Sequence, residues 1–128
     1  MPLLQFDSSA AMTAGEKRAF ARRVRELYAE QMETGTDHVA VVIRERTEAE
    51  LSIGRADPDQ PALVLDAEIR GGREFEAKRE FALAVMELAN DAWAIPDPNM
   101  KVVFTEHAGE GMMGVDRVGG EWTPDEGE

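Results

Sequence analysis

The chain has 128 residues, no cysteine and a formal net charge of −12 at pH 7, with 43% hydrophobic and 31% charged residues. This length and composition are typical of one globular domain with a real hydrophobic core, and they argue against disorder. The acidic excess argues against nucleic acid as a partner, because binding a phosphate backbone requires a basic surface. Without cysteine there is no disulfide, thiolate metal site or thiol nucleophile. We therefore expect one domain over residues 1–128 that uses no metal and no other cofactor.

The chain also lacks signals for export or membrane insertion. No apolar run approaches the length of a membrane span, and the amino terminus lacks the basic-then-apolar layout of a signal peptide. We therefore expect a cytoplasmic protein without a membrane partner. Only three residues are lysine, so arginine supplies most of the positive charge. Arginines gathered in one place would make a local site for a carboxylate.

The chain opens with Met1 and Pro2, followed by an apolar run over residues 3–6 that predicts a strand. A small second residue allows removal of the initiator methionine, which would leave Pro2 with a free secondary amine held rigid by its ring. Burial lowers the pKa of such an amine towards neutrality, where a general base works best. Pro2 is therefore a candidate general base. The alternative is a passive proline before an edge strand.

Helical and strand patterns then alternate. Thr13 and Glu16 have capping-box spacing, and the apolar residues that follow recur at helical spacing, which predicts a helix over residues 14–33 ended by Gly35. A β-branched run predicts a strand over 38–45. The next segments are predicted to be a short strand or hairpin arm over 51–55 and a turn-rich connector over 57–61.

The second half repeats the first. The pattern predicts a strand over 62–69, a tight loop over 70–73, a helix over 74–91, a loop over 95–99 and a strand over 100–106. The shift of 61 positions that carries Lys17 onto Lys78 also carries residues 41–45 onto the matching residues 102–106.

Two β-α-β units, over about 2–46 and 62–107, thus predict an α+β fold built from α/β-type units. We expect a four-stranded mixed sheet with two helices on one face, right-handed crossovers and a pseudo-two-fold axis. In this repeat Pro2 corresponds to Leu63, so only the first unit can start with a free amine.

Two short motifs accompany the proline start. Arg70 and Arg73 bracket two glycines just before a helix, where two guanidinium groups can bind one anion; the alternative is a solvated loop. Residues 34–38 read Thr-Gly-Thr-Asp-His. With the doubled unit, these motifs resemble the tautomerase superfamily over nearly the whole chain, most closely its cis-3-chloroacrylic acid dehalogenase-like group. The opening residues also resemble those of malonate semialdehyde decarboxylases of the same superfamily.

This resemblance implies a tautomerase or MIF-like fold and a homotrimer with the N-terminal proline at the bottom of each pocket. It implies that Pro2 transfers protons on small enol or 2-oxo carboxylates, as in enzymes similar to 4-oxalocrotonate tautomerase, with Arg70 and Arg73 binding the carboxylate. No cofactor is implied.

Three positions depart from the dehalogenase pattern. Tyr28 stands where the group has a helix-borne histidine, and Val103 stands where it has a strand tyrosine. Gly114 stands where it has a water-activating glutamate, and Asp116 is the nearest carboxylate. The missing water activator favours proton transfer over hydrolytic dehalogenation or hydration.

Other residues remain candidates for substrate binding. Tyr28 is expected either to reach the pocket or to act as a core aromatic. Residues 108–122 are expected to pack on a neighbouring subunit, with Asp116 and Arg117 entering the pocket or forming an ion pair at the subunit boundary. His38 and His107 are expected at the surface or at strand ends, without a metal. Residues 123–128 are expected to form a frayed acidic tail.

The sequence therefore predicts a trimeric, cofactor-independent tautomerase that acts on small carboxylates. An enzymatic alternative is a malonate semialdehyde-type decarboxylase, in which protonated Pro2 would polarise a carbonyl. A lyase similar to cis-3-haloacrylate dehalogenases or hydratases is a further enzymatic alternative. The non-enzymatic alternative is a trimeric binding protein that retains Met1.

Overall fold

The structure, a computed structural model, describes residues 1–119. The predicted acidic tail and the last three residues of the predicted oligomerisation segment lie outside the described residues. In chain order the elements are β1 (Leu3–Ser8), α1 (Ala14–Met32), β2 (Ala40–Glu45), β3 (Leu63–Arg70), α2 (Phe75–Trp93), the 3-10 turn η1 (Asp97–Asn99), β4 (Met100–His107), the 3-10 turn η2 (Gly109–Gly111), β5 (Met113–Gly114) and β6 (Arg117–Val118).

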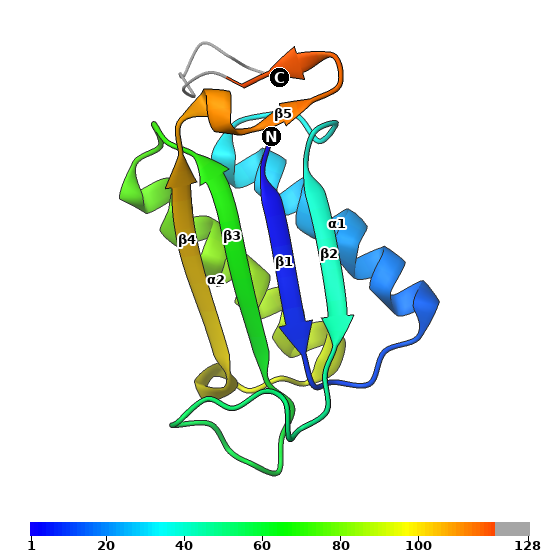
Figure 1. The fold of residues 1–128 in the computed structure, drawn as a ribbon. Helices are drawn as coiled ribbons and strands as arrows, with labels where there is room; N and C mark the ends of the chain where they lie inside the picture. Colours follow the sequence, from blue (N-terminus) through cyan, green and yellow to red (C-terminus); the bar gives the residue numbers. More distant parts are fainter. Residues whose placement is uncertain (120–128) are drawn as a thin grey trace.

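The four long strands form one mixed sheet in the order β2-β1-β3-β4. The outer pairs β1–β2 and β3–β4 are parallel, and the central pair β1–β3 is antiparallel. Both helices cover one face of this sheet, and the short β5–β6 hairpin lies across the end where the chain starts (Figure 1). The predicted mixed sheet with two helices on one face is confirmed. Within residues 1–119, neither helix is apolar enough over a sufficient length to cross a bilayer.

The two units of the repeat are held by equivalent ion pairs. Lys17 of α1 reaches Glu45 at the end of β2, and Lys78 of α2 reaches Glu106 near the end of β4, both at 2.8 Å. Each pair ties a helix to the strand that follows it. Partly exposed pairs of this kind contribute little free energy singly, but their equivalence shows that Glu45 and Glu106 are structural.

The helix boundaries confirm one prediction and correct another. The capping box is present: Glu16 N–H donates to Thr13 Oγ1 at 3.1 Å, and Thr13 N–H donates to Glu16 Oε1 at 2.7 Å. The predicted stop at Gly35 is wrong, because the left-handed residue that ends α1 is Glu33, with φ of 52°. Ala94 ends α2 in the same way. In both helices the left-handed residue donates its N–H back to the last turn, which fixes the end without glycine.

The core lies between the sheet and the two helices. Alternate residues of β1 and β3 point into it, as expected for strands with one face covered. Phe6 packs edge-on against Phe20 of α1, with ring centroids 5.1 Å apart, and Phe81 of α2 packs edge-on against Tyr28 at 5.2 Å. Burial of each large apolar side chain contributes about 1.5–3 kcal/mol, so these rings anchor the helices together with the other buried apolar residues of the core.

The long connector between the units contains no strand, so the prediction for residues 51–55 is wrong. Its later part is held instead by one buried side chain. Asn99 Nδ2 donates to the carbonyls of Asp57, Gln60 and Pro61, and Asn99 Oδ1 accepts from Asp57 N–H at 2.9 Å. Because this side chain satisfies the connector's polar groups, the connector needs no strand partner there.

A charged cluster joins β1 to β2 on the face of the sheet opposite the helices. Arg44 donates from Nε to Asp7 Oδ1 at 2.9 Å and from Nη2 to Asp7 Oδ2 at 3.1 Å. Arg46 Nε donates to Asp7 Oδ1 at 2.8 Å. The hydrogen bond from Arg44 is the main reason that the pKa of Asp7 lies below its usual value; burial opposes this shift, and Arg46 reinforces it.

The cluster gives a test of stability against pH. A carboxyl with a lowered folded-state pKa stabilises the protein fully above its unfolded-state pKa of about 3.9, and this contribution is lost as the pH falls through the folded-state value. We expect Asp7→Asn to lower the free energy of unfolding by about 1 kcal/mol at pH 7. In urea unfolding at fixed protein concentration, this difference should disappear on acidification. Asp91→Asn, exposed on α2, is the control. A pH-independent difference would contradict the assignment.

Candidate active site

Pro2 lies where the two units meet. Because β1 and β3 run antiparallel, the start of β1 lies beside the end of β3, with Leu3 opposite Glu68. Pro2 is buried, and its carbonyl accepts a hydrogen bond from Ala40 N–H at 3.0 Å. Proline has no N–H to donate to the sheet. While Met1 is attached, the Pro2 nitrogen is an amide and not a base; removal of Met1 would convert it into an amine.

A cavity of about 270 Å³ opens beside Pro2. Arg70 and Arg117 both line it, together with His38 and Asp37. Two guanidinium groups around one small hollow suit an anion with two oxygens, such as a carboxylate. The sequence predicted Arg70 and Arg73 as the anion site and Arg117 as a residue that could enter the pocket; Arg70 and Arg117 line this cavity, and Arg73 does not.

Arg70 is the last residue of β3 and is only 9% exposed. The residue after it, Gly71, donates its N–H to the carbonyl of His107 at 2.9 Å, which continues the β3–β4 pairing past the strand end. The chain after β6 passes very close: a Cβ on Gly119 would lie 2.8 Å from the Gly109 oxygen and 3.3 Å from Arg70 Cδ. Glycine at 119 thus lets the C-terminal segment cover Arg70.

Arg117 and His38 meet across the mouth of this cavity, 79 residues apart in the chain. Arg117 Nη1 lies 2.7 Å from His38 Nε2. Because arginine stays protonated and can only donate, His38 Nε2 accepts and its proton is assigned to Nδ1. His38 was not singled out from the sequence as a site residue, although it closes the motif at residues 34–38. Its position places that motif in the wall of the cavity.

Arg73 and Tyr28 lie elsewhere. Gly72 turns the chain with φ of 119°, a conformation that favours glycine. Arg73 is then directed towards α1, where its Nε donates to the carbonyl of Met32 at 3.0 Å. Its guanidinium carbon lies 5.6 Å from the ring centroid of Tyr28, which is 1% exposed. Neither side chain lines the cavity beside Pro2, so the structure separates Arg73 from Arg70.

The remaining predicted residues are also placed. Asp116 is exposed in the turn of the β5–β6 hairpin and does not line the cavity. A Cβ on Gly114 would lie 3.2 Å from the end of the Met1 side chain, so this hairpin lies against the chain start. Among residues 1–119, no group of three or more histidine, cysteine, aspartate or glutamate side chains is placed to hold a metal ion.

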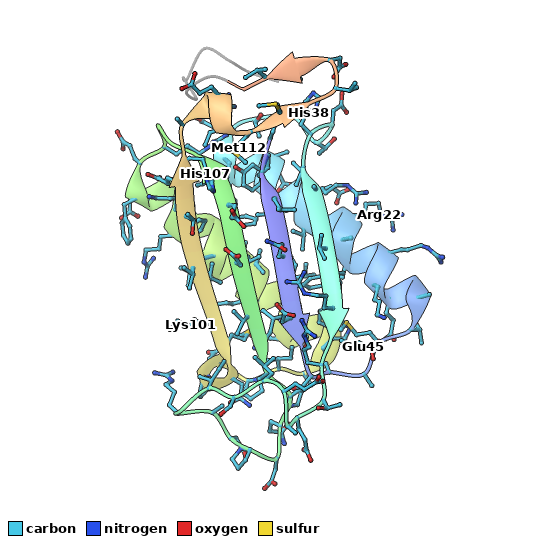
Figure 2. All side chains as sticks on the ribbon, in the orientation of Figure 1. Arg22, His38, Glu45, Lys101, His107 and Met112 are labelled. Atoms are coloured by element: carbon cyan, nitrogen blue, oxygen red, sulfur yellow. The ribbon has the colours of Figure 1, made fainter. Side chains whose placement is uncertain are left out.

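A second cavity, of about 340 Å³, lies on the other side of Met1 and Pro2. His107 and Glu68 line it from the ends of β4 and β3, with His107 Nε2 3.0 Å from Glu68 Oε1. Figure 2 shows His38, His107 and Met112 at the same end of the sheet. Glu68 was not identified from the sequence; the only signal was its place on the polar face of β3, two residues before Arg70.

The contacts of Arg73 predict a structural effect. Arg73→Leu removes the hydrogen bond to Met32 and the stacking on Tyr28, and we expect the free energy of unfolding to fall by about 2 kcal/mol. Arg79→Leu, at an exposed position of α2, should change it by less than about 0.5 kcal/mol. Urea unfolding at one protein concentration measures both. Equal stability of the Arg73 variant and the unaltered protein would show that these contacts contribute nothing.

The fold has clear counterparts among solved structures. A protein described as N1, of the cis-3-chloroacrylic acid dehalogenase family, superposes with a TM-score of 0.80 at 21% identity, over 93% of this chain and 84% of its own. An FG41 malonate semialdehyde decarboxylase inhibited by 3-bromopropiolate gives 0.76 at 16% identity, over 90% and 91% of the two chains. A fused 4-OT described as a symmetric trimer gives 0.75 at 18%, over 86% and 91%.

The sequence itself matches no protein-family model, and it matches no curated protein closely enough to identify a relative. At these identities the likeness to solved structures establishes the architecture and not the chemistry. The chain thus has the fold of the tautomerase superfamily, as its proline start and doubled β-α-β unit predicted.

Proposed function

We propose that the protein is a tautomerase in which Pro2, freed by removal of Met1, transfers protons on a small enol or 2-oxo carboxylate. One observation carries this proposal: buried Pro2 and the nearly buried Arg70 line the same cavity. Arg117 lines it as well. A general base and an anion site therefore lie within reach of one small molecule.

The reaction needs only proton transfer. Arg70 and Arg117 hold the substrate carboxylate, which places the enol next to the Pro2 nitrogen. The neutral amine takes the enol O–H proton, and that bonding pair becomes the second bond of the carbonyl. The electron pair of the carbon–carbon double bond then takes the proton back from the prolinium, at carbon. The product is an isomer of the substrate, and Pro2 ends as a neutral amine, so no water or cofactor is consumed.

The charges around Pro2 suit this role. Arg70 and Arg117 disfavour the ammonium form of an amine at Pro2, which keeps more of it available as a base, while the carboxylates of Asp37 and Glu68 oppose this effect. Arginine also stabilises the negative charge that develops on the enolate oxygen. Arg73, which the family resemblance assigns to the carboxylate, has a different part in this proposal. Arg73 packs against Tyr28 of α1 and so fixes the Gly71-Gly72 loop that follows Arg70.

We further propose a homotrimer. Among residues 1–119, no element covers the face of the sheet opposite the helices, and Val103 on that face is 43% exposed. The β5–β6 hairpin adds the exposed Val115 and Val118. Exposed apolar side chains are often covered at an interface, and a structural counterpart is described as a symmetric trimer. The same sheet face also carries the cluster of Asp7, Arg44 and Arg46. Packing of this hairpin on a neighbouring copy would cover the two valines.

The rival activities fit the cavity less well. A decarboxylase of the malonate semialdehyde type would need Pro2 protonated, and the adjacent arginines disfavour that form. A dehalogenase would need a water activator, and glycine occupies position 114, where the family has one. A binding protein would retain Met1, which the mass of the intact protein decides directly.

The role of the Pro2 amine can be tested by altering the amino terminus. We expect the protein without Met1 to convert phenylenolpyruvate to the keto form, and Pro2→Ala to lower kcat/KM by about 10² or more. A matched control keeps the proline ring but adds one glycine before Pro2, which converts the amine into an amide. This variant should be as inactive as Pro2→Ala. Intact mass confirms each amino terminus. Activity in the glycine-extended protein would refute a Pro2 base.

The trimer has its own test. The unaltered protein should elute with a light-scattering mass about three times the 14.1 kDa of one chain. Val103→Lys on β4 should shift it towards monomer, because a charge buried at the interface lacks a partner. Leu83→Lys, at an equally exposed position of α2 (44% against 43%), is the matched control and should remain trimeric. A monomeric unaltered protein, or equal effects of both variants, would contradict this interface.

A further inference from the structure

The two cavities that meet at Pro2 differ in character. The first has Arg70 and Arg117 in its wall, whereas the second has Glu68. The second wall also contains the imidazoles of His38 and His107, and the rest of it is largely apolar, with Leu3, Ala40, Met112 and Met113. Met1 lines both cavities. Pro2 and His38 line both cavities as well, so the two cavities adjoin at the chain start, and loss of the Met1 side chain would widen the space there.

Glu68 is fixed in place from two sides. Its Oε1 lies 3.0 Å from His107 Nε2, and its Oε2 accepts a hydrogen bond from Gln5 Nε2 at 3.1 Å. The side chain is 30% exposed, so solvent screens its charge only in part. A carboxylate held at both oxygens cannot easily rotate away from an approaching group. The carboxylate, with the His107 imidazole beside it, is therefore a fixed feature of the second cavity.

We infer that the site accepts a monocarboxylate with an uncharged, apolar tail, and that Glu68 excludes substrates with a second carboxylate. The carboxylate head lies at Arg70 and Arg117, and the tail passes Pro2 into the second cavity. A dicarboxylate bound in this way would bring its far end against Glu68, where two like charges repel each other in a partly desolvated space. This inference rests on the proposed function, because it needs Met1 removed.

Binding of two unreactive acids tests the inference apart from catalysis. Cinnamate carries one carboxylate and an aromatic tail, and trans,trans-muconate carries a carboxylate at each end. In titration calorimetry with the Met1-free protein, we expect cinnamate to bind about tenfold more tightly, or better. Glu68→Gln keeps a hydrogen-bond acceptor for its neighbours but removes the charge. Muconate should then bind more tightly, so the ratio of the muconate to the cinnamate dissociation constant should fall below about threefold. Glu68→Ala should shift the ratio in the same direction.

Asp66→Asn is the matched control, because it removes a carboxylate from the same face of β3 at a position that does not line the cavity. It should leave the ratio unchanged. Muconate binding as tight as cinnamate, an unchanged ratio in both Glu68 variants, or binding of neither acid would overturn the inference. Turnover of phenylenolpyruvate on the same samples separates the two claims. A tenfold preference without turnover would refute the proposed function alone, and turnover without a preference would refute only the inference.

Discussion

The hydrogen bond from Ala40 N–H to the carbonyl of Pro2 fixes the part of the molecule on which the candidate site depends. It begins the parallel pairing of β1 with β2, while the antiparallel pairing of β1 with β3 brings the end of β3 alongside. Pro2 is thus paired to the sheet through its carbonyl, and its ring nitrogen has no proton to give to the sheet. The nitrogen can then face the cavities, and Arg70, the last residue of β3, lines the same hollow.

The pseudo-two-fold repeat explains the scaffold, and its exceptions mark the site. Helix-to-strand ion pairs and left-handed helix ends occur at equivalent positions in both units. Position 38 is an exception: its equivalent in the second unit is Asn99, which is fully buried and uses its amide to hold the connector. His38 instead faces a cavity and accepts from Arg117. The same place in the two units therefore serves packing in one and a candidate site in the other.

The fold could be predicted because its signals are local and repeated: apolar periodicity, a capping box and one constant shift between the units. The site could be predicted only in part. Arg70 and Arg73 are three positions apart, but the positive φ of Gly72 directs them to different sides of the loop, and no spacing rule shows that. The contact of His38 with Arg117 joins residues 79 positions apart through the C-terminal hairpin. Such a contact follows from tertiary packing, and neither segment has a sequence pattern that predicts it.

Removal of Met1 would have two structural consequences at once. It would convert the Pro2 amide into an amine and remove a side chain that lines both cavities. It would also remove the side chain that lies against Gly114 of the β5–β6 hairpin. The hairpin's own apolar groups give it little hold on its own chain, since Met113 and Val118 are 64% and 58% exposed. Gly119, just after the hairpin, lies against Arg70, and Arg117 within the hairpin lines the first cavity. In the trimer that we propose, a neighbouring copy that covered the hairpin would therefore also hold this wall of the site in place.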